Sequence, residues 1–219
     1  MKIKKSWFAL FTMPLFAVFL IVVFLPFVAG IGYSFVKWDG IPKNAKTFVG
    51  LANYARALTD GEFLTSLART SLFTLITVAL VNVLALAFAL VVTSRLKTRN
   101  FARTLLFMPY LIGGLLLGYI WRFILGDGMT ALAELTGRSD LFFFWLSDTR
   151  FAFLGLIVVS IWQMAGYFMV IYVAGLQSIS DEVLEAARID GAGFWKLLFH
   201  VRLPLLMPSI TICLFLTLS

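Results

Sequence analysis

The distribution of charged residues constrains this chain more than any other feature of its sequence. All 18 Lys and Arg and all 11 Asp and Glu residues fall into five short blocks, separated by long uncharged stretches. These stretches are Ser6–Val36, Thr70–Ser94, Thr104–Trp121, Phe151–Ser180 and Leu203–Ser219. A helix that crosses a bilayer needs roughly 20 apolar residues, so four stretches are long enough and the fifth has barely begun. The pattern predicts an all-α, polytopic helical membrane protein.

The composition agrees with a lipid environment. Hydrophobic residues make up 61% of the chain and the mean hydropathy is +0.97, far above the values of ordinary globular proteins. The net charge of +7 is no argument for nucleic acid, because basic residues beside membrane helices set their orientation. Cys213 is the only cysteine, so no disulfide can form within the chain.

We expect one transmembrane domain over residues 1–219, with spans at about 13–35, 71–93, 104–121 and 151–173 and an incomplete span at 203–219. The first apolar run is too long for a cleaved signal peptide, which has about 7 to 15 apolar residues, so it is predicted to remain as a span. Because an apolar run reaches the end of the given sequence, we expect the chain to be truncated before its last span or spans.

The positive-inside rule predicts the orientation of the spans. The amino terminus, the loop Arg95–Arg103 and the segment Gly175–Arg202 fall on one side and are rich in Lys and Arg. That side is predicted to be cytoplasmic. The segment Lys37–Arg69 on the opposite side also carries five basic residues, mixed with acidic ones, so charge alone favours this orientation without excluding the reverse.

The polar block at residues 180–204 is predicted to form two short helices. Ser180 is a favourable N-cap, and the two acidic residues after it suit the first turn of a helix. Gly191 and Gly193 allow a left-handed turn. A second helix over Phe194–Arg202 should end where a proline follows.

Three other classes of protein fit the residues less well. A DNA-binding helix-turn-helix would need a polar recognition helix, whereas Phe194–Phe199 is apolar apart from Lys196. An enzyme is disfavoured, because His200 is the only histidine and no metal-site or ATP-binding motif is present; we expect no catalytic residue, metal or cofactor. An ion-coupled secondary transporter normally carries ionisable groups within its spans, and the uncharged stretches have none.

The polar block carries a pattern that resembles a known family. The permeases of binding-protein-dependent importers share the signature E-A-A, three residues, G, nine residues, I-x-L-P. The matching residues here are Glu185, Ala186, Ala187, Gly191, Val201, Leu203 and Pro204, with Val in place of Ile. Further similarity to the carbohydrate-uptake branch lies at Phe48–Tyr54, Arg103, Phe107, Pro109, Trp121, Trp162, Gly166, Tyr167, Ala174–Gln177, Asp190–Ala192 and Pro208.

The resemblance implies a type I permease subunit of an ATP-binding-cassette importer in a bacterial-type inner membrane, with a cytoplasmic amino terminus. Residues 180–204 would be the coupling loop, which contacts a separate ATP-hydrolysing subunit through Glu185, Ala186, Ala187, Asp190 and Gly191 and joins the membrane at Leu203 and Pro204. The implied partners are a second permease, two ATPase subunits and an extracytoplasmic solute-binding protein, with no nucleic acid. The alternative is an ion-coupled secondary transporter or another polytopic membrane protein.

Candidates for contact with the transported solute are polar or aromatic residues within the spans. They are Asn82, Trp162, Gln163 and Tyr167. Aromatic faces and uncharged hydrogen-bonding groups bind sugars, but the same groups also join helices to one another. The sequence does not distinguish a sugar from glycerol phosphate.

Two further features concern packing. Gly114 and Gly118 form a G-x-x-x-G pair, which allows helices to approach closely, and we expect it to pack within this chain rather than to mediate dimerisation. The aromatic run Leu141–Leu146 is too short to cross a bilayer. It is predicted to be an interfacial helix or a buried loop.

Overall fold

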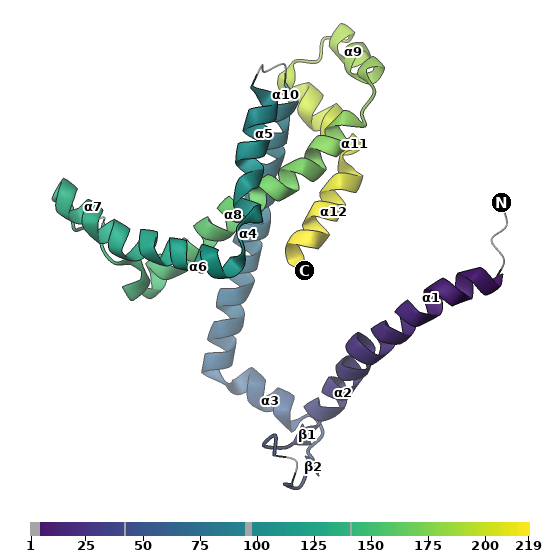
Figure 1. Cartoon of the computed structure of the whole chain (residues 1–219), viewed down its shortest axis with the longest axis vertical. Helices are drawn as coiled ribbons and strands as arrows, with labels where there is room; N and C mark the ends of the chain where they lie inside the picture. The colour runs from purple at the N-terminus through teal and green to yellow at the C-terminus, as the bar shows by residue number, and fades with distance from the viewer. Residues whose placement is uncertain (1–4, 42, 95–97, 141) are drawn as a thin grey trace. The chain divides into compact units, whose positions relative to one another are not determined.

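The computed structural model describes residues 5–41, 43–94, 98–140 and 142–219, with side chains from Leu10 onward. Regular structure in these ranges is almost entirely helical, which confirms the all-α prediction (Figure 1). The chain divides between Arg69 and Thr70 into two compact units, which are described separately.

The first unit contains an apolar helical stretch, a small sheet and a connecting helix. Its elements are α1 (Lys5–Phe19), a π-helical turn (Leu20–Phe24), α2 (Leu25–Ser34), β1 (Val36–Lys37), β2 (Thr47–Phe48) and α3 (Ala52–Thr59). The strands pair antiparallel, with Val36 opposite Phe48. Helix α4 (Gly61–Thr93) begins in this unit and continues into the second.

The loop between the two strands is held by aromatic and polar contacts. The rings of Tyr33 and Trp38 stack with their centroids 5.5 Å apart, and Lys46 Nζ lies 4.8 and 4.4 Å from the two ring centroids. Asp39 accepts hydrogen bonds from the Asn44 side chain and the Ile41 backbone N–H. These bonds stabilise the carboxylate and lower the pKa of Asp39 below its ordinary value.

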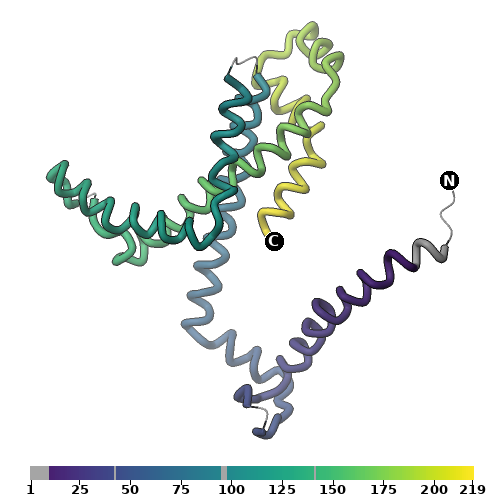
Figure 2. The backbone as a smooth tube through the Cα atoms, in the orientation of Figure 1, coloured from purple at the N-terminus to yellow at the C-terminus, as the bar shows by residue number. Residues whose placement is uncertain are grey.

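The second unit is a group of helices packed around the long helix α8. Its helices are α5 (Arg99–Phe107), α6 (Gly114–Phe123), α7 (Met129–Thr136), α8 (Thr149–Gln177), α9 (Asp181–Ile189), α10 (Phe194–Lys196), α11 (Leu203–Leu205) and α12 (Met207–Leu218). Figure 2 follows this path from the teal part of the trace through green to yellow. One buried cluster joins α4, α8 and α12 and includes Val81, Phe168, Met169 and Cys213.

Helix α8 uses three glycines to bring other segments close to its backbone. A Cβ atom placed on Gly155 would lie 2.8 Å from Leu125 Cδ1, and one on Gly166 would lie only 1.8 Å from the carbonyl oxygen of Leu106. A Cβ atom placed on Gly175 would likewise lie too close to side-chain atoms of Ser209 in α12. All three distances are below van der Waals contact, and at Gly166, where the neighbouring atoms belong to the backbone, only glycine permits the observed packing.

The G-x-x-x-G pair does not behave as expected. A Cβ atom on Gly114 or Gly118 would meet nothing within 4 Å, so neither glycine packs against another segment in the described part of the chain. The expectation of packing within this chain is wrong. The spacing of two small residues permits close approach but does not specify a neighbouring helix.

Within the described residues, four helical stretches are long and apolar enough to cross a membrane. They are Leu10–Ser34, Gly61–Thr93, Gly114–Thr136 and Thr149–Gln177, and the bent pair Phe194–Leu205 and Met207–Leu218 could form a fifth. The stretch expected as the third span, residues 104–121, is not one helix. It changes to a 3-10 turn at Met108–Leu111 and resumes as α6 at Gly114, because Pro109 lacks an N–H and Gly113 adopts an extended conformation.

Two parts of the sequence argument fall partly outside the described residues. The prediction of orientation uses Lys2, Lys4, Arg95 and Lys97, which lie outside these ranges. In the aromatic run, Leu141 is also outside. The rest of the run forms a loop with a single 3-10 turn, Trp145–Ser147, rather than a longer interfacial helix.

Candidate functional site

Residues 180–204, called the coupling segment below, form the helix pair that the sequence predicts. Ser180 has an extended backbone at the N-cap of α9, and two acidic residues follow it, although its side chain makes no capping hydrogen bond. Negative charge in this first turn stabilises the amino-terminal end of a helix. Helix α9 then ends at Ile189, before the predicted glycine turn.

The turn after α9 is a complete Schellman motif. Gly191 has a φ of +80°, its N–H donates to the carbonyl of Arg188 at 3.0 Å, and the N–H of Ala192 donates to the carbonyl of Ala187 at 2.9 Å. Glycine is favoured here because a side chain is strained in this conformation. Gly193 is different from the expectation: its φ is −69° and it occupies the N-cap of α10. Only Gly191 supplies the left-handed residue.

The second helix extends further than predicted. It runs from Phe194 through a π-helical turn at Leu197–Arg202 into α11, and Pro204 lies within it rather than ending it. A proline in a helix clashes with the carbonyl four residues earlier and removes one hydrogen bond, and a widened π turn just before it accommodates both effects. The chain bends by 71° two residues later, at Leu206.

The residues of the family signature lie mainly on the surface of the second unit. The exposed ones are Glu185, Ala186, Gly191 and Pro204, and Asp190 beside them is exposed too, whereas Ala187, Val201 and Leu203 are partly covered. Ile189 at the end of α9 is 85% exposed. Glu185 has no ion-pair partner within the described residues. An exposed apolar tip flanked by charged residues, here Arg188 and Asp190, is suited to contact another protein.

A second group of candidates lies along α8, facing the break between α5 and α6. The Tyr167 ring stacks on that of Tyr110, with centroids 4.3 Å apart. Gln163 Nε2 donates to the carbonyl of Ile112 at 3.4 Å. The structure therefore brings two of the predicted residues into contact with the irregular segment that replaces the expected third span.

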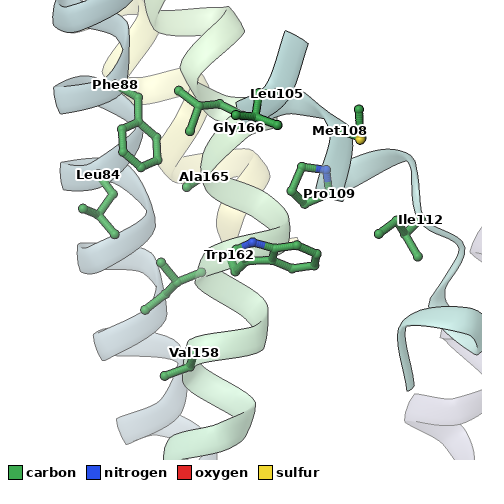
Figure 3. Close-up of a pocket in the computed structure, with 12 residues that line it drawn as sticks. Leu84, Phe88, Leu105, Met108, Pro109, Ile112, Val158, Trp162, Ala165 and Gly166 are labelled. Atoms are coloured by element: carbon green, nitrogen blue, oxygen red, sulfur yellow. The ribbon is translucent and has the colours of Figure 1, made fainter. Parts of the chain in front are cut away.

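Trp162 lies beside an apolar cavity of about 540 Å³ and is 41% exposed. Figure 3 shows its ring projecting from α8 toward Pro109 and Ile112. Trp121 meets it edge to face, with ring centroids 5.4 Å apart. The other residues around the cavity are Leu84, Phe88, Leu105, Leu106, Met108, Val158, Ile161, Ala165 and Gly166. Part of an aromatic face on α8 thus remains open for a ligand.

Asn82 differs from these residues, because its side-chain amide is hydrogen-bonded inside the buried core. Its Nδ2 donates to the carbonyl of Val78 at 2.8 Å and lies 3.2 Å from Thr217 Oγ1. Its Oδ1 accepts a hydrogen bond from the Tyr172 hydroxyl. The arrangement joins α4, α8 and α12, and a buried amide with these partners contributes to helix association.

Sequence reasoning did not single out the partners of these residues. Tyr172 had one usable signal, since a tyrosine hydroxyl within an apolar stretch needs a hydrogen-bond partner when buried. For Tyr110 the sequence offered no such signal, because its stacking on Tyr167 depends on the break after α5. The close contact of Gly166 is consistent with the rule that glycine in a helix marks a close approach, but the rule does not name the neighbour.

Comparisons with known proteins agree with the fold and with the family that the sequence resembles. Residues 82–219 match the family described as binding-protein-dependent transport system inner membrane component. The chain is 43% identical over 213 residues to the probable starch degradation products transport system permease protein AmyD of Thermoanaerobacterium thermosulfurigenes, covering 97% of this chain and 72% of the relative. It is 31% identical over 209 residues to the multiple sugar-binding transport system permease protein MsmF of Streptococcus mutans, covering 95% and 72%.

Two further comparisons extend this picture. The sn-glycerol-3-phosphate transport system permease protein UgpA of Agrobacterium fabrum is 34% identical over 169 residues, which cover 75% of this chain and 56% of the relative. A crystal structure of a bacterial ABC transporter that imports the acidic polysaccharide alginate has the same fold, with a TM-score of 0.78 at 20% identity, covering 97% of this chain and 73% of that one. The chain therefore belongs to the inner membrane components of binding-protein-dependent transport systems, as a multi-pass permease subunit of an ABC importer.

Proposed function

We propose that this permease forms part of the path by which a neutral sugar enters the cell, delivered by an extracytoplasmic binding protein. The names of AmyD and MsmF refer to starch degradation products and sugars, which supports a sugar as the solute. Family membership favours this function over the ion-coupled secondary transporter that the sequence left open.

The observation that carries the proposal is the uncharged, partly open surface of α8. Trp162 exposes an aromatic face, and Gln163 and Tyr167 follow it along the helix. Neither α8 from Phe151 onward nor α4 from Thr70 onward carries a charged residue. A sugar ring binds to aromatic faces and neutral hydrogen-bonding groups, whereas a phosphate needs a cation or several N–H donors. Asn82 supports this surface from the core by joining α8 to α4.

The remaining assembly follows the same proposal. A second permease completes the path, and two separate subunits bind and hydrolyse ATP, since this chain has no P-loop sequence. The amino terminus and the coupling segment lie in the cytoplasm, where α9 inserts its exposed tip at Ile189 into an ATPase subunit. The proposed spans are the four apolar helical stretches and the bent pair at 194–218.

Uptake by the assembled transporter in proteoliposomes tests the sugar assignment. With its ATPase subunits, second permease and binding protein present, we expect ATP-dependent uptake of maltotriose and none of sn-glycerol 3-phosphate. Replacement of Trp162 by Ala (W162A) should reduce maltotriose uptake about tenfold, because stacking of a desolvated ring contributes on the order of 1 kcal/mol or more. Leu135→Ala on α7 is the control, since Leu135 is 83% exposed and outside this surface. Uptake of glycerol phosphate instead would contradict the proposal.

A further inference from the structure

The coupling segment is joined to the buried core of the second unit at both of its ends. Ile179 directly precedes it and is buried, and Leu206 follows it by two residues and is 1% exposed. Both belong to one cluster with Leu176 of α8, and Leu184 of α9 packs against that cluster. Because packed interiors deform little, a displacement of α9 must move these core helices or break their packing.

Gly175 of α8 lies where this cluster meets the beginning of α12. A Cβ atom placed on Gly175 would stand 2.3 Å from Ser209 Oγ, 3.0 Å from Ser209 Cβ and 2.8 Å from Leu206 Cδ2. A side chain here would force Ser209 and Leu206 to change their side-chain conformations or α12 to shift. Glycine therefore lets the corner after the coupling segment rest directly on the backbone of α8.

The other glycines of α8 make contacts of a different kind. Gly155 faces Leu125, and Gly166 faces the backbone of Leu106 in α5. Neither neighbour belongs to the coupling segment or to α12. Of the three close approaches on α8, only the one at Gly175 involves the corner at Leu206.

Helix α8 is continuous between this contact and the proposed solute surface. It runs without a break from Thr149 to Gln177, so Gly175 and Trp162 lie on one rigid rod, about 20 Å apart at a rise of 1.5 Å per residue. A shift imposed on α8 at Gly175 consequently changes the position of Trp162. The movement does not need a separate hinge.

We propose that Gly175 is a positioning residue for transport, because its contact with Leu206 and Ser209 transmits movement of the coupling segment to the solute-facing part of α8. This inference rests on the proposed function of α9 and of the Trp162 surface. It adds a residue that touches neither the solute nor an ATPase subunit. Its expected signature is a loss of coupling, with ATP hydrolysis continuing while transport falls.

The test compares Gly175→Ala (G175A) with Gly118→Ala (G118A) in the complete transporter in proteoliposomes, with maltotriose as the probe. The measured quantity is maltotriose taken up per ATP hydrolysed. We expect G175A to lower this ratio about fivefold or more, in the range of typical coupling free energies, and to retain ATP hydrolysis. G118A adds the same methyl group where nothing lies within 4 Å, so its ratio should remain at the wild-type value.

A second substitution distinguishes the contact from a general effect of the methyl group. Ser209→Gly (S209G) removes the two Ser209 atoms nearest to the added methyl, so the double variant G175A/S209G should recover most of the lost ratio. A wild-type ratio in G175A, or no recovery in the double variant, would overturn the proposal. If neither G175A nor G175A/S209G is found in the membrane, Gly175 is needed for folding, and this result would overturn the proposal too.

The proposed function is tested separately with Ile189→Asp (I189D) on the tip of α9. If I189D leaves ATP-driven uptake unchanged, the coupling role of α9 fails whatever G175A does. If I189D abolishes uptake and G175A has no effect, α9 couples but Gly175 does not transmit the movement.

Discussion

The hydroxyl of Tyr172 on α8 donates a hydrogen bond of 2.8 Å to Asn82 Oδ1 on α4, inside the buried core of the second unit. Both residues are buried, at 2% and 9% exposure. Because Asn82 also contacts Thr217 of α12, one polar contact point connects three helices that are otherwise packed through apolar side chains. Polar contacts of this kind specify how apolar helices are oriented toward one another.

Removing the Tyr172 hydroxyl should destabilise the protein without changing its shape. Tyr172→Phe leaves Asn82 Oδ1 without its donor, and we expect a loss of about 0.5 to 2 kcal/mol, the range for hydrogen bonds between membrane helices. Thermal unfolding in detergent measures the change. Tyr119→Phe is the control, since Tyr119 is largely exposed and should unfold as the wild type does. Equal unfolding of both variants would show that the Tyr172 bond contributes nothing.

Gly166→Ala should be among the most damaging methyl additions in this chain. The new Cβ would lie 1.8 Å from the carbonyl oxygen of Leu106, and a backbone atom cannot move away as a flexible side chain can. Overpacking typically costs about 1 to 3 kcal/mol, and a backbone clash should reach at least the upper part of that range. The amount of folded protein extracted from membranes measures the effect. Gly114→Ala, with open space around it, should be extracted at the wild-type level.

Gly191→Ala tests the backbone conformation of the turn without steric interference. Nothing lies within 4 Å of the added methyl, but φ is +80°, so the change should cost about 1 to 2 kcal/mol through backbone strain alone. The expected result is weaker protection of the α9 amides from hydrogen exchange. Gly193→Ala is the control, because Gly193 has an ordinary φ of −69°. In this variant the α9 amides should be as well protected from hydrogen exchange as in the wild type. The opposite order of the two variants would contradict the Schellman assignment.

Ile189→Ser should weaken binding of the ATPase subunit but leave the permease itself stable. Ile189 is 85% exposed, so the substitution removes little packing within this chain. Full burial of an isoleucine in a partner contributes about 1.5 to 3 kcal/mol, which corresponds to roughly 10- to 150-fold in affinity. Titration of the purified ATPase subunit against the permease in nanodiscs measures it. Leu135→Ser, exposed to a similar extent on α7, should bind as the wild type does.

The sequence predicted the helical class and the family well, because both depend on local features. A bilayer requires long uncharged runs, and these are visible without any partner. The turn at Gly191 follows from the left-handed conformation that glycine adopts readily at a helix end. The solute and the role of Trp162 are proposals that the uptake experiment tests, and the orientation and the role of Gln163 are proposals as well.

The errors lie where the outcome depends on a neighbouring helix or on a local defect. Pro204 was expected to end the second helix, but the π turn before it lets the helix continue to Leu205. The stretch 104–121 was expected to form the third span, but its α-helix ends at Phe107 and a 3-10 turn follows. A proline inside a helix interrupts its hydrogen-bond pattern, and the surrounding packing decides whether the helix bends, widens or stops.

The amino-acid sequence by itself determined that the chain is helical, that its apolar stretches suit a membrane, and where the polar helix pair at residues 180–204 lies. Only the tertiary structure decided which glycines contact other segments, since Gly166 and Gly175 do so while Gly114 and Gly118 meet none among the described residues. It also decided that Asn82 pairs with Tyr172, 90 residues away in the chain. The physical reason is that hydrophobic runs and turn conformations are properties of consecutive residues, whereas a close contact depends on which distant segment packs there.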